Sequence, residues 1–191
     1  KNDSLKSITY QKVKGAGTKA NPYLIYDGND MNEINYYLQL GNDFTGKYFK
    51  VAPGVTTIDL SLKELSYTAL GSRETFFNGN FNGNNATFIL NIDKENEDNQ
   101  GIFKTLGENA LVENITINGI VKGLSYVGSL TGRNLGTIRN INNYATIIGL
   151  HNDVGGIVGY NEGVITNVFN YGPVKAAGSF VGGIAGQSYQ T

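Results

Sequence analysis

Residues 127–180 hold two consecutive copies of one 27-residue pattern, and this repeat decides the fold. The first copy, residues 127–153, reads VGSLTGRNLGTIRNINNYATIIGLHND, and the second, residues 154–180, reads VGGIVGYNEGVITNVFNYGPVKAAGSF. Nine of the 27 positions are identical, whereas average amino-acid usage gives roughly two matches by chance. A partial third copy, VGGIAGQSYQT, occupies residues 181–191. The chain therefore contains a true internal repeat.

The glycines of the repeat predict structural turns rather than a phosphate-binding loop. The recurring positions are Gly128, Gly132, Gly155, Gly159, Gly182 and Gly186. A dinucleotide-binding loop needs a strand, the pattern GxGxxG and then a helix, but GGIVGYNEGVI has the wrong spacing and leads into a strand pattern. The Gly-Lys-Ser/Thr of a P-loop is also missing. We expect these glycines to supply positive φ angles at the corners of each repeat.

One turn of a parallel β-helix fits a unit of this length. The second copy contains the β-forming runs GIVGY, VITNVFN and PVKAAG, separated by Asn-Glu-Gly and Tyr-Gly-Pro. No segment of the repeat shows a 3.6-residue period over helical length, which excludes helical and leucine-rich repeats. A propeller blade would need about 40–45 residues. We therefore predict the all-β class, a parallel β-helix solenoid whose coils stack about 4.8 Å apart.

Stacking places equivalent residues of successive coils above one another. Asn140 and Asn167 would form one side-chain amide ladder, and Asn143 and Asn170 another. The neighbouring pair Tyr144 and Tyr171 would likewise stack. These two tyrosines, flanked by Asn143 and Asn170, are the candidate binding residues for a glycan or a host protein. The alternative is a ladder that only seals a corner of the solenoid.

The repeat becomes weaker towards the N-terminus. Residues 101–126 form a degenerate copy, in which Asn114 and Val121 precede Asn140 and Ile147 by 26 residues. Residues 76–92 have a similar texture without a fixed register. The acidic stretch DKENEDNQ, residues 93–100, is predicted to be a loop that leaves the stack.

Residues 1–66 have a different pattern and are predicted to be an N-terminal cap preceding the coils of residues 67–191. The stretch NDMNEINYYLQLG predicts a helix over residues 30–40, with Asp30 as N-cap, Glu33 completing a capping box and Gly41 as the stop signal. Met31, Ile34 and Leu38 line one face of this helix, which would shield the open end of the solenoid. KYFKV (47–51) and TTIDLSL (56–62) would be the first strands.

Composition excludes several classes of partner and cofactor. The 191 residues carry a formal net charge of −1, which gives no electrostatic reason to expect nucleic acid or an anionic membrane. There are no cysteines, so disulfides, thiol nucleophiles and Cys-ligated metals are ruled out. No apolar run is long enough to insert into a membrane. The opening KNDSLKSITY has no apolar signal region and no initiator Met, so we expect a piece of a longer chain.

The sequence offers no convincing catalytic or metal site. Residues 101–191 contain four carboxylates that could act on a sugar, and none recurs at the 27-residue spacing: Glu108, Glu113, Asp153 and Glu162. DKENEDNQ lacks the ordered ligands and the glycine of a calcium loop. His151, the one histidine, lies two residues before Asp153 without a matching serine or further zinc ligands. We therefore predict no catalytic residue, no metal and no cofactor.

Several blocks of the chain resemble bacterial surface proteins that carry GLUG repeats. The blocks are Gly17-Thr18, Asn21-Pro22-Tyr23-Leu24-Ile25, Gly46-Lys47-Tyr48-Phe49, Asp59-Leu60, YTALGS (67–72), FNGNFNGNNATF (77–88), Gly101-Ile102-Phe103 and VGGIVG. Tyr67 and Ala69 depart from the family's Trp-x-Pro-Ile-Gly. The resemblance covers about residues 15–191 and implies a right-handed parallel β-helix on secreted or cell-surface proteins. Such repeats occur in adhesin-like proteins and in the N-terminal regions of immunoglobulin-A-cleaving zinc proteases.

Three functional hypotheses follow from these observations. The first is a non-catalytic module of a bacterial secreted or cell-surface protein that acts in adhesion, host-ligand binding or spacing. The second is a solenoid that positions substrate for a large secreted immunoglobulin-A-type zinc protease. The third is a carbohydrate-active β-helix enzyme.

Overall fold

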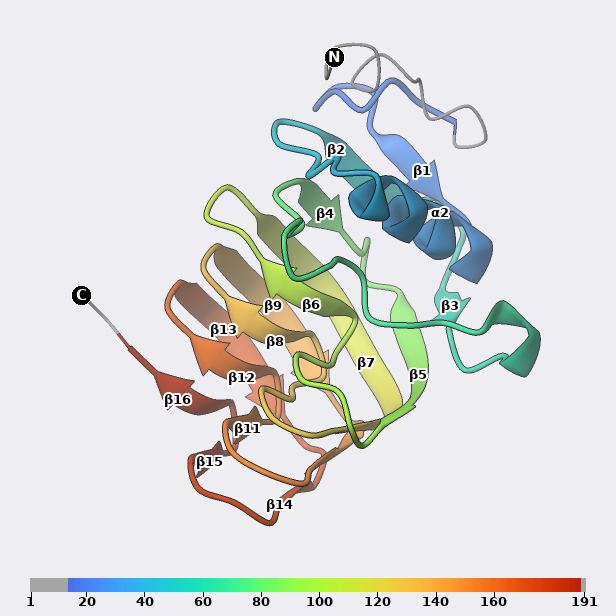
Figure 1. Ribbon diagram of the computed structural model, residues 1–191. Coiled ribbons are helices and arrows are strands. Elements are labelled where there is room, and N and C mark those ends of the chain that lie inside the picture. Colours follow the sequence, from blue (N-terminus) through green and yellow to red (C-terminus); the bar gives the residue numbers. More distant parts are fainter. Residues whose placement is uncertain (1–13, 190–191) are drawn as a thin grey trace.

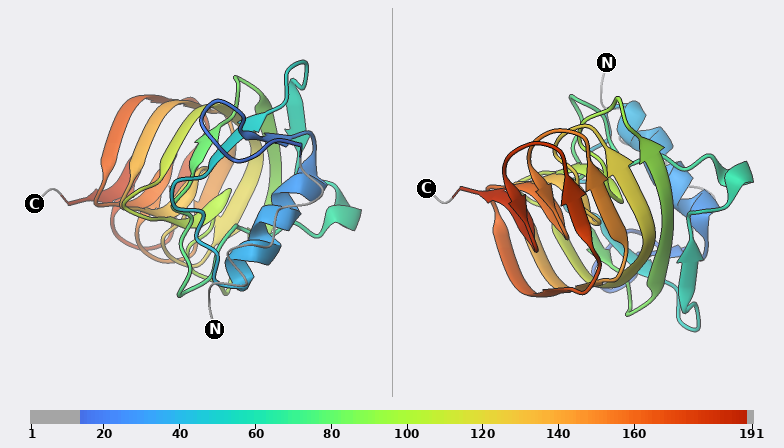
Figure 2. Two further views of the ribbon diagram at one scale, coloured as in Figure 1. Left: turned by 90° about the horizontal axis from the view of Figure 1, so that it is seen from above. Right: turned by 90° about the horizontal axis from the view of Figure 1, so that it is seen from below.

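The computed structural model describes residues 14–189, which form a parallel β-solenoid of about six turns with one short N-terminal α-helix (Figures 1 and 2). The predicted β-helix architecture is therefore confirmed. In chain order the elements are β1 (Tyr23–Ile25), α2 (Gly28–Gln39), β2 (Tyr48–Val51), β3 (Thr57–Asp59), the 3-10 helix η1 (Lys63–Leu65), β4 (Asn80–Asn82), β5 (Thr87–Lys94), β6 (Phe103–Leu106), β7 (Leu111–Gly123), β8 (Thr131–Asn134), β9 (Thr137–Asn143), β10 (Thr146–Gly149), β11 (Val154–Gly155), β12 (Val158–Asn161), β13 (Val164–Asn170), β14 (Val174–Ala176), β15 (Val181–Gly182) and β16 (Ala185–Ser188).

The register between coils reproduces the repeat read from the sequence. β11 pairs with β15 in parallel, with Val154 opposite Val181, a separation of 27 residues. β7 pairs with β9 at a separation of 26 residues, with Ile115 opposite Ile141. The earlier segment, whose register the sequence left open, also joins the stack through Phe81, which lies opposite Val112. The weaker copies are therefore full coils of the same solenoid.

One row of inward-facing side chains runs through the core from coil to coil. Paired strand positions place these residues in line: Phe49, Phe81, Val112, Ile138 and Ile165. The row is aromatic in the N-terminal coils, where the rings of Phe49 and Phe81 have centroids 6.4 Å apart, and aliphatic further on. Burying each such side chain contributes on the order of 1.5–3 kcal/mol, so this core is the main stabilising term.

Burial falls off at the C-terminal end of the described chain. Val112 and Ile138 are fully buried, whereas their counterpart Ile165 in β13 is only partly buried against the core. β13, β14 and β16 pair with a neighbour on one side among the described residues. This edge therefore carries the exposed side chains Phe169, Tyr171 and Phe180.

Residues other than the repeat glycines turn the chain at its corners, which corrects the prediction that those glycines supply positive φ. Asn114, Asn140 and Asn167 have φ angles of 60°, 56° and 52°, a left-handed conformation that asparagine tolerates better than most residues. A second column of left-handed corner residues consists of Asn99, Tyr126, Asp153 and Phe180. None of the six repeat glycines lies in this region of φ.

The repeat glycines are needed for close approach instead. A Cβ atom built on Gly128 would lie 2.5 Å from the backbone oxygen of Ile157, and one on Gly159 would lie 2.5 Å from the backbone carbon of Tyr126. Such distances are far inside van der Waals contact. The sequence therefore identified the glycines as structural but assigned them the wrong physical role, because steric exclusion between coils is a tertiary effect.

The helix begins earlier than predicted. α2 has Asp27, not Asp30, as its N-cap, and the Asp27 carboxylate accepts hydrogen bonds from the amides of Asn29 and Asp30. Asp30 lies in the first turn and accepts from the Tyr26 amide at 2.7 Å. Desolvation raises the pKa of Asp30 more than these hydrogen bonds lower it. The predicted capping box on Asp30 is therefore wrong by one helical turn, because both aspartates satisfy the N-cap preference.

The stop signal of the helix is confirmed. Gly41 has a φ of 86°, and its amide donates to the Leu38 carbonyl while the Asn42 amide donates to the Tyr37 carbonyl. This pair of bonds is a Schellman motif, which satisfies two carbonyls at the helix end.

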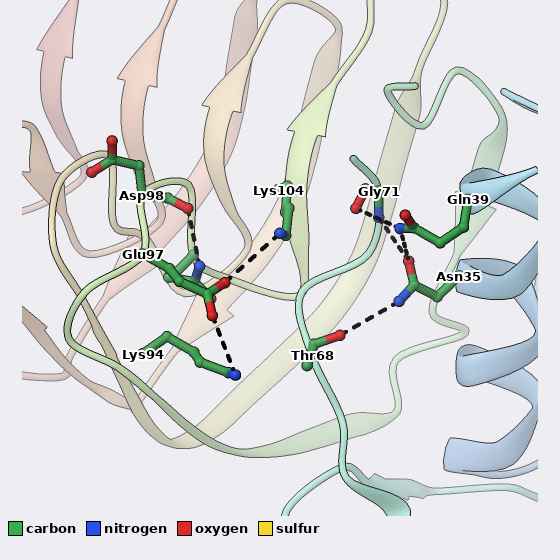
Figure 3. Close-up of polar contacts among 9 residues, drawn as sticks. Asn35, Gln39, Thr68, Gly71, Lys94, Glu97, Asp98 and Lys104 are labelled. Carbon is green, nitrogen blue, oxygen red and sulfur yellow. Dashed lines mark hydrogen bonds and ion pairs between the residues drawn. The ribbon is translucent and has the colours of Figure 1, made fainter. Parts of the chain in front are cut away.

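α2 lies at the N-terminal end of the stack, away from the C-terminal coil (Figures 1 and 2). Its face of Met31, Ile34 and Leu38 is fully buried and belongs to the solenoid core. Figure 3 shows how its polar side attaches to the following segment: the Asn35 side-chain oxygen accepts from the Gly71 amide at 3.0 Å, and Gln39 donates to the Gly71 carbonyl at 2.9 Å. The helix therefore packs onto the end of the solenoid as the amphipathic pattern predicted.

Two further boundaries differ from the sequence expectations. β1 precedes the predicted first strands and pairs with β2, with Tyr23 opposite Phe49. The acidic stretch of residues 93–100 leaves the stack only in part, since β5 continues through Lys94 and Asp93 lies opposite Lys122. The last two residues of β5, Asp93 and Lys94, are both charged, so the sequence alone does not separate them from the acidic stretch that follows.

Candidate functional site

The two predicted tyrosines form an exposed, co-facial stack. Tyr144 directly follows β9 and Tyr171 follows β13, so the parallel register of these strands places one above the other. Their ring centroids are 4.8 Å apart with an interplanar angle of 15°. Phe169 extends the stack, with its ring 6.4 Å from that of Tyr171. The three side chains are 51%, 61% and 48% exposed for Tyr144, Tyr171 and Phe169 respectively.

The predicted amide ladder of Asn143 and Asn170 also forms, but it faces inward. The Asn143 side chain donates to the Asn170 side-chain oxygen at 2.8 Å and to the Ala145 carbonyl, and accepts from the Ala145 amide at 3.0 Å. Asn170 repeats the same pair of bonds with Gly172. Asn143 is fully buried. These amides are engaged in holding the corner, which leaves the tyrosine rings as the groups accessible to a ligand.

A second predicted ladder lies on the outside of the corner. Asn167 donates to the side-chain oxygen of Asn140 at 2.7 Å, and Asn140 donates to that of Asn114 at 2.9 Å. Asn114 in turn donates to the side-chain oxygen of Asn82 at 3.2 Å, so the chain of amides spans four coils. Asn114, Asn140 and Asn167 each tolerate the left-handed backbone and bond a neighbouring coil, which rigidifies this edge of the solenoid.

A third ladder was missed from the sequence. Asn134 donates to the side-chain oxygen of Asn161 at 2.8 Å, and Asn161 donates to the Ser188 hydroxyl. The identity of these asparagines at the 27-residue spacing was the available signal. Their role stayed hidden because only the structure shows that both side chains turn inward.

Three of the four carboxylates of the repeats have clear environments. Glu113 accepts from Arg139 Nε at 2.6 Å and from Asn82 at 3.1 Å. Glu162 accepts from Arg133 Nε at 2.7 Å. Glu108 is exposed in the turn between β6 and β7. Since Glu113 and Glu162 are each held by an arginine, neither is presented as a free acid or base.

Asp153 is the unusual carboxylate of the group. It is 7% exposed, its Oδ1 has no hydrogen-bond partner, and desolvation raises the pKa of its carboxyl group. It lines a cavity of about 400 Å³ together with Tyr126, Arg133 and Tyr160. His151 is exposed in the preceding turn. The proximity of His151 and Asp153 in sequence therefore does not give a shared buried environment.

Replacing Asp153 by asparagine is expected to stabilise the fold at neutral pH by about 1 kcal/mol, because an amide avoids the desolvation of a buried charge and tolerates positive φ. The folded pKa of Asp153 lies above its unfolded value. Between these two pKa values the folded state binds more protons than the unfolded state. The contribution of Asp153 to the free energy of unfolding therefore falls as the pH rises from the unfolded to the folded pKa.

The advantage of Asp153→Asn should accordingly shrink as pH falls below the folded pKa of Asp153. Urea unfolding of both proteins at a series of pH values measures this. Glu162→Gln, which changes an exposed ion-paired carboxylate, provides the control and should show no such gain. A lower stability of Asp153→Asn at neutral pH would contradict the assignment.

The acidic stretch forms ion pairs rather than a ligand set for a metal. Glu97 lies between Lys94 and Lys104, with nitrogen–oxygen distances of 3.3 and 3.9 Å (Figure 3). Asp98 accepts from the Ser125 amide at 3.0 Å, and Glu95 pairs with Lys122. Within residues 14–189, no three His, Cys, Asp or Glu side chains are grouped so as to hold a metal ion.

No helix in this same range combines the length and apolar character required to cross a bilayer.

No family model matches the sequence. Two relatives and one solved structure are similar to the chain. A "Putative Gly-rich membrane protein" of Evansella cellulosilytica is 32% identical over 133 residues, covering 66% of this chain and 15% of the relative. "Halomucin" of Haloquadratum walsbyi is 27% identical over 137 residues, covering 71% of this chain and 2% of the relative. The chain thus spans a small fraction of the length of both relatives.

The structural likeness supports the fold. The crystal structure of a "putative immunoglobulin A1 protease" from Bacteroides ovatus superposes with a TM-score of 0.65 at 21% identity, covering 92% of this chain and 64% of that chain. At this level of identity the likeness shows a shared β-solenoid fold.

Proposed function

We propose that the chain is a rigid, non-catalytic β-solenoid module of a secreted or cell-surface protein, and that it binds a glycan or a host protein through the exposed aromatic stack. The single observation that carries the proposal is the stack of Tyr144 and Tyr171 on a corner whose hydrogen bonds are already satisfied. Adjacent exposed aromatic side chains form a contiguous apolar patch, and such patches are typical of interaction sites.

The surroundings of the stack suit a binding role. The two rings restrain each other by stacking, and inward asparagine bonds fix the backbone beneath them, so the rings lose little conformational freedom when a ligand binds. Tyrosine combines a large apolar face with a hydroxyl group, which is the combination enriched at recognition surfaces. The likeness to parts of two much longer proteins supports a module within a longer chain.

The order of sequence blocks that resembles GLUG-repeat surface proteins supports an extracellular setting. The names of the two relatives, a Gly-rich membrane protein and a halomucin, support a surface setting for this chain. Adhesion, ligand capture and spacing all need a stiff element that resists unfolding, and a stacked solenoid with three amide ladders provides one.

Removing both rings is expected to weaken binding at least tenfold. The double variant Tyr144→Ala/Tyr171→Ala would be compared with the original chain on an array of mammalian glycans and a panel of purified extracellular-matrix proteins. A tenfold change corresponds to about 1.4 kcal/mol, within the range of an exposed aromatic anchor.

Tyr36→Ala is the matched control, because Tyr36 is 60% exposed on α2 at the other end of the molecule. It should leave binding unchanged. If the double variant binds every probe as well as the original chain does, the stack is structural and the proposed binding role is wrong.

A substrate-positioning solenoid of a secreted immunoglobulin-A-type protease is the second candidate. The fold likeness to the Bacteroides ovatus protein favours it. Purified immunoglobulin A would serve as the probe, with immunoglobulin G as control. Selective binding of immunoglobulin A, together with a zinc-protease HExxH motif elsewhere in the full reading frame, would support this candidate over a general adhesin module.

A further inference from the structure

A groove crosses the outer face of four neighbouring strands in the N-terminal half of the solenoid. It has a volume of about 330 Å³ and lies over β2, β4, β7 and β9, which are paired in this order (Figure 1). Its lining includes Lys19, Tyr48, Lys50, Asn82, Glu113 and Arg139. A cavity of this size falls within the range of small-ligand sites.

Strand pairing places four of the lining residues in one row, and three of the four are charged. Lys50 lies opposite Asn82, Asn82 opposite Glu113, and Glu113 opposite Arg139. Three interstrand spacings of about 4.8 Å place Lys50 roughly 14 Å from Arg139. The row therefore runs along the solenoid axis, at right angles to the strands.

At one end of the row, Arg139 is held in place by hydrogen bonds that involve Glu113 and Asn82. Both oxygens of Glu113 are engaged, one by Asn82 at 3.1 Å and the other by Arg139 Nε at 2.6 Å. The Glu113 side chain is 15% exposed, whereas that of Arg139 is 48% exposed. Held through Nε, the guanidinium group keeps its remaining N–H groups for a further acceptor.

The side chains that line the groove carry more positive than negative charge. Lys19, Lys50 and Arg139 face a single carboxylate among the lining residues, that of Glu113, which Arg139 already pairs. Lys19 is exposed and Lys50 is half-buried. An anionic ligand is therefore favoured by charge complementarity, although the chain as a whole carries a net charge of −1.

We propose that this groove binds a carboxylated glycan chain laid along the solenoid axis, with one acid group near Lys19 and Lys50 and a second near Arg139. The roughly 14 Å between the ends of the row suits a polymer with repeated acid groups rather than a single small anion. Tyr48 lies two residues before Lys50 on β2, beside one end of the row, and its ring can contact a sugar ring. The Asn82 side chain is already bonded to Glu113, Asn114 and the Asn84 amide, so it holds the row together.

The strand pairing favours a glycan over an acidic peptide. β4 and β7 have a paired strand on each side, so their main-chain groups are already used within the sheet. Peptides that bind β-sheets usually add a strand to a free edge, and this groove offers none in its interior. Recognition here depends on side chains alone, which is sufficient for the acid groups and hydroxyls of a sugar.

Binding of labelled polygalacturonate by the full chain at 0.15 M salt tests the proposal, with dextran as the neutral glycan and poly-L-glutamate as the acidic peptide. We expect polygalacturonate to bind, dextran not to bind, and the affinity to fall as salt rises to 0.5 M, because exposed charges are screened. The variant Lys19→Gln/Lys50→Gln should bind at least tenfold more weakly.

The charge-matched control is Lys63→Gln/Lys175→Gln, since both lysines are exposed and lie outside the groove. It should retain the original affinity within about twofold, and far-UV circular dichroism should show that both double variants are folded. Equal loss in both variants, stronger binding of poly-L-glutamate, or no binding of polygalacturonate would each overturn the proposal.

The groove is a separate site from the tyrosine stack, so binding at either one can be lost without the other. Tyr144 and Tyr171 are not part of the groove lining. The tyrosine double variant should therefore leave polygalacturonate binding intact.

Discussion

Replacing Asn143 by alanine is expected to destabilise the solenoid by about 3 kcal/mol. The side chain of Asn143 makes three hydrogen bonds inside the corner, two with the main chain of Ala145 and one with Asn170. Both Asn143 and Ala145 are fully buried. Alanine would therefore leave a buried amide and a buried carbonyl without partners, at about 1–3 kcal/mol each.

Urea unfolding followed by circular dichroism measures this effect. Asn142→Ala is the matched control, because Asn142 is the adjacent residue of β9, points outward and is only partly buried. Its substitution should change the free energy of unfolding by less than about 0.5 kcal/mol. Similar midpoints for the two variants would show that the inward amide ladder does not hold the corner.

Substitution of Gly128 by alanine is expected to have a comparable effect, about 3 kcal/mol, through a different mechanism. The added Cβ would lie 2.5 Å from the Ile157 oxygen and 2.6 Å from the Thr131 oxygen. Both obstacles are backbone atoms of the stack, which cannot turn aside as a flexible side chain can. Relief requires the coils to separate locally, and forced overpacking of this kind typically costs about 1–3 kcal/mol or more.

Gly183→Ala separates this steric effect from the general consequences of changing a glycine. A Cβ on Gly183 would meet nothing within 4 Å, and its φ lies outside the left-handed region. This substitution should leave the free energy of unfolding unchanged or raise it by up to about 1 kcal/mol, because alanine lowers the conformational entropy of the unfolded chain. Equal destabilisation by both changes would contradict the close-approach role of Gly128.

Much of the fold could be predicted because the repeat carries its own register. Val127, Val154 and Val181 are equally spaced in the sequence, and their backbones indeed pair from coil to coil. The amide ladders of Asn140 with Asn167 and of Asn143 with Asn170 followed from the same spacing. Repetition converts a long-range contact into a local sequence pattern, which removes the usual difficulty of predicting strand pairing.

The errors arose where one residue type serves two physical purposes. Glycine permits positive φ and also permits close backbone approach, and Gly128 is needed for the second purpose only. Aspartate at position 27 and aspartate at position 30 are both good N-caps, and the structure uses Asp27. Local preference cannot choose between such alternatives, because the decision depends on what packs against the residue.

The sequence by itself determined the class of the fold, the length of its repeating coil, the helix that packs on its N-terminal end and the stacking of Tyr144 on Tyr171. Only the tertiary structure decided which asparagines face inward, and which charged residues share a surface. Lys50, Asn82, Glu113 and Arg139 form one row although their spacings in the chain are 32, 31 and 26 residues. Coils of unequal length carry no common period, so a row across them exists only once the backbone has stacked.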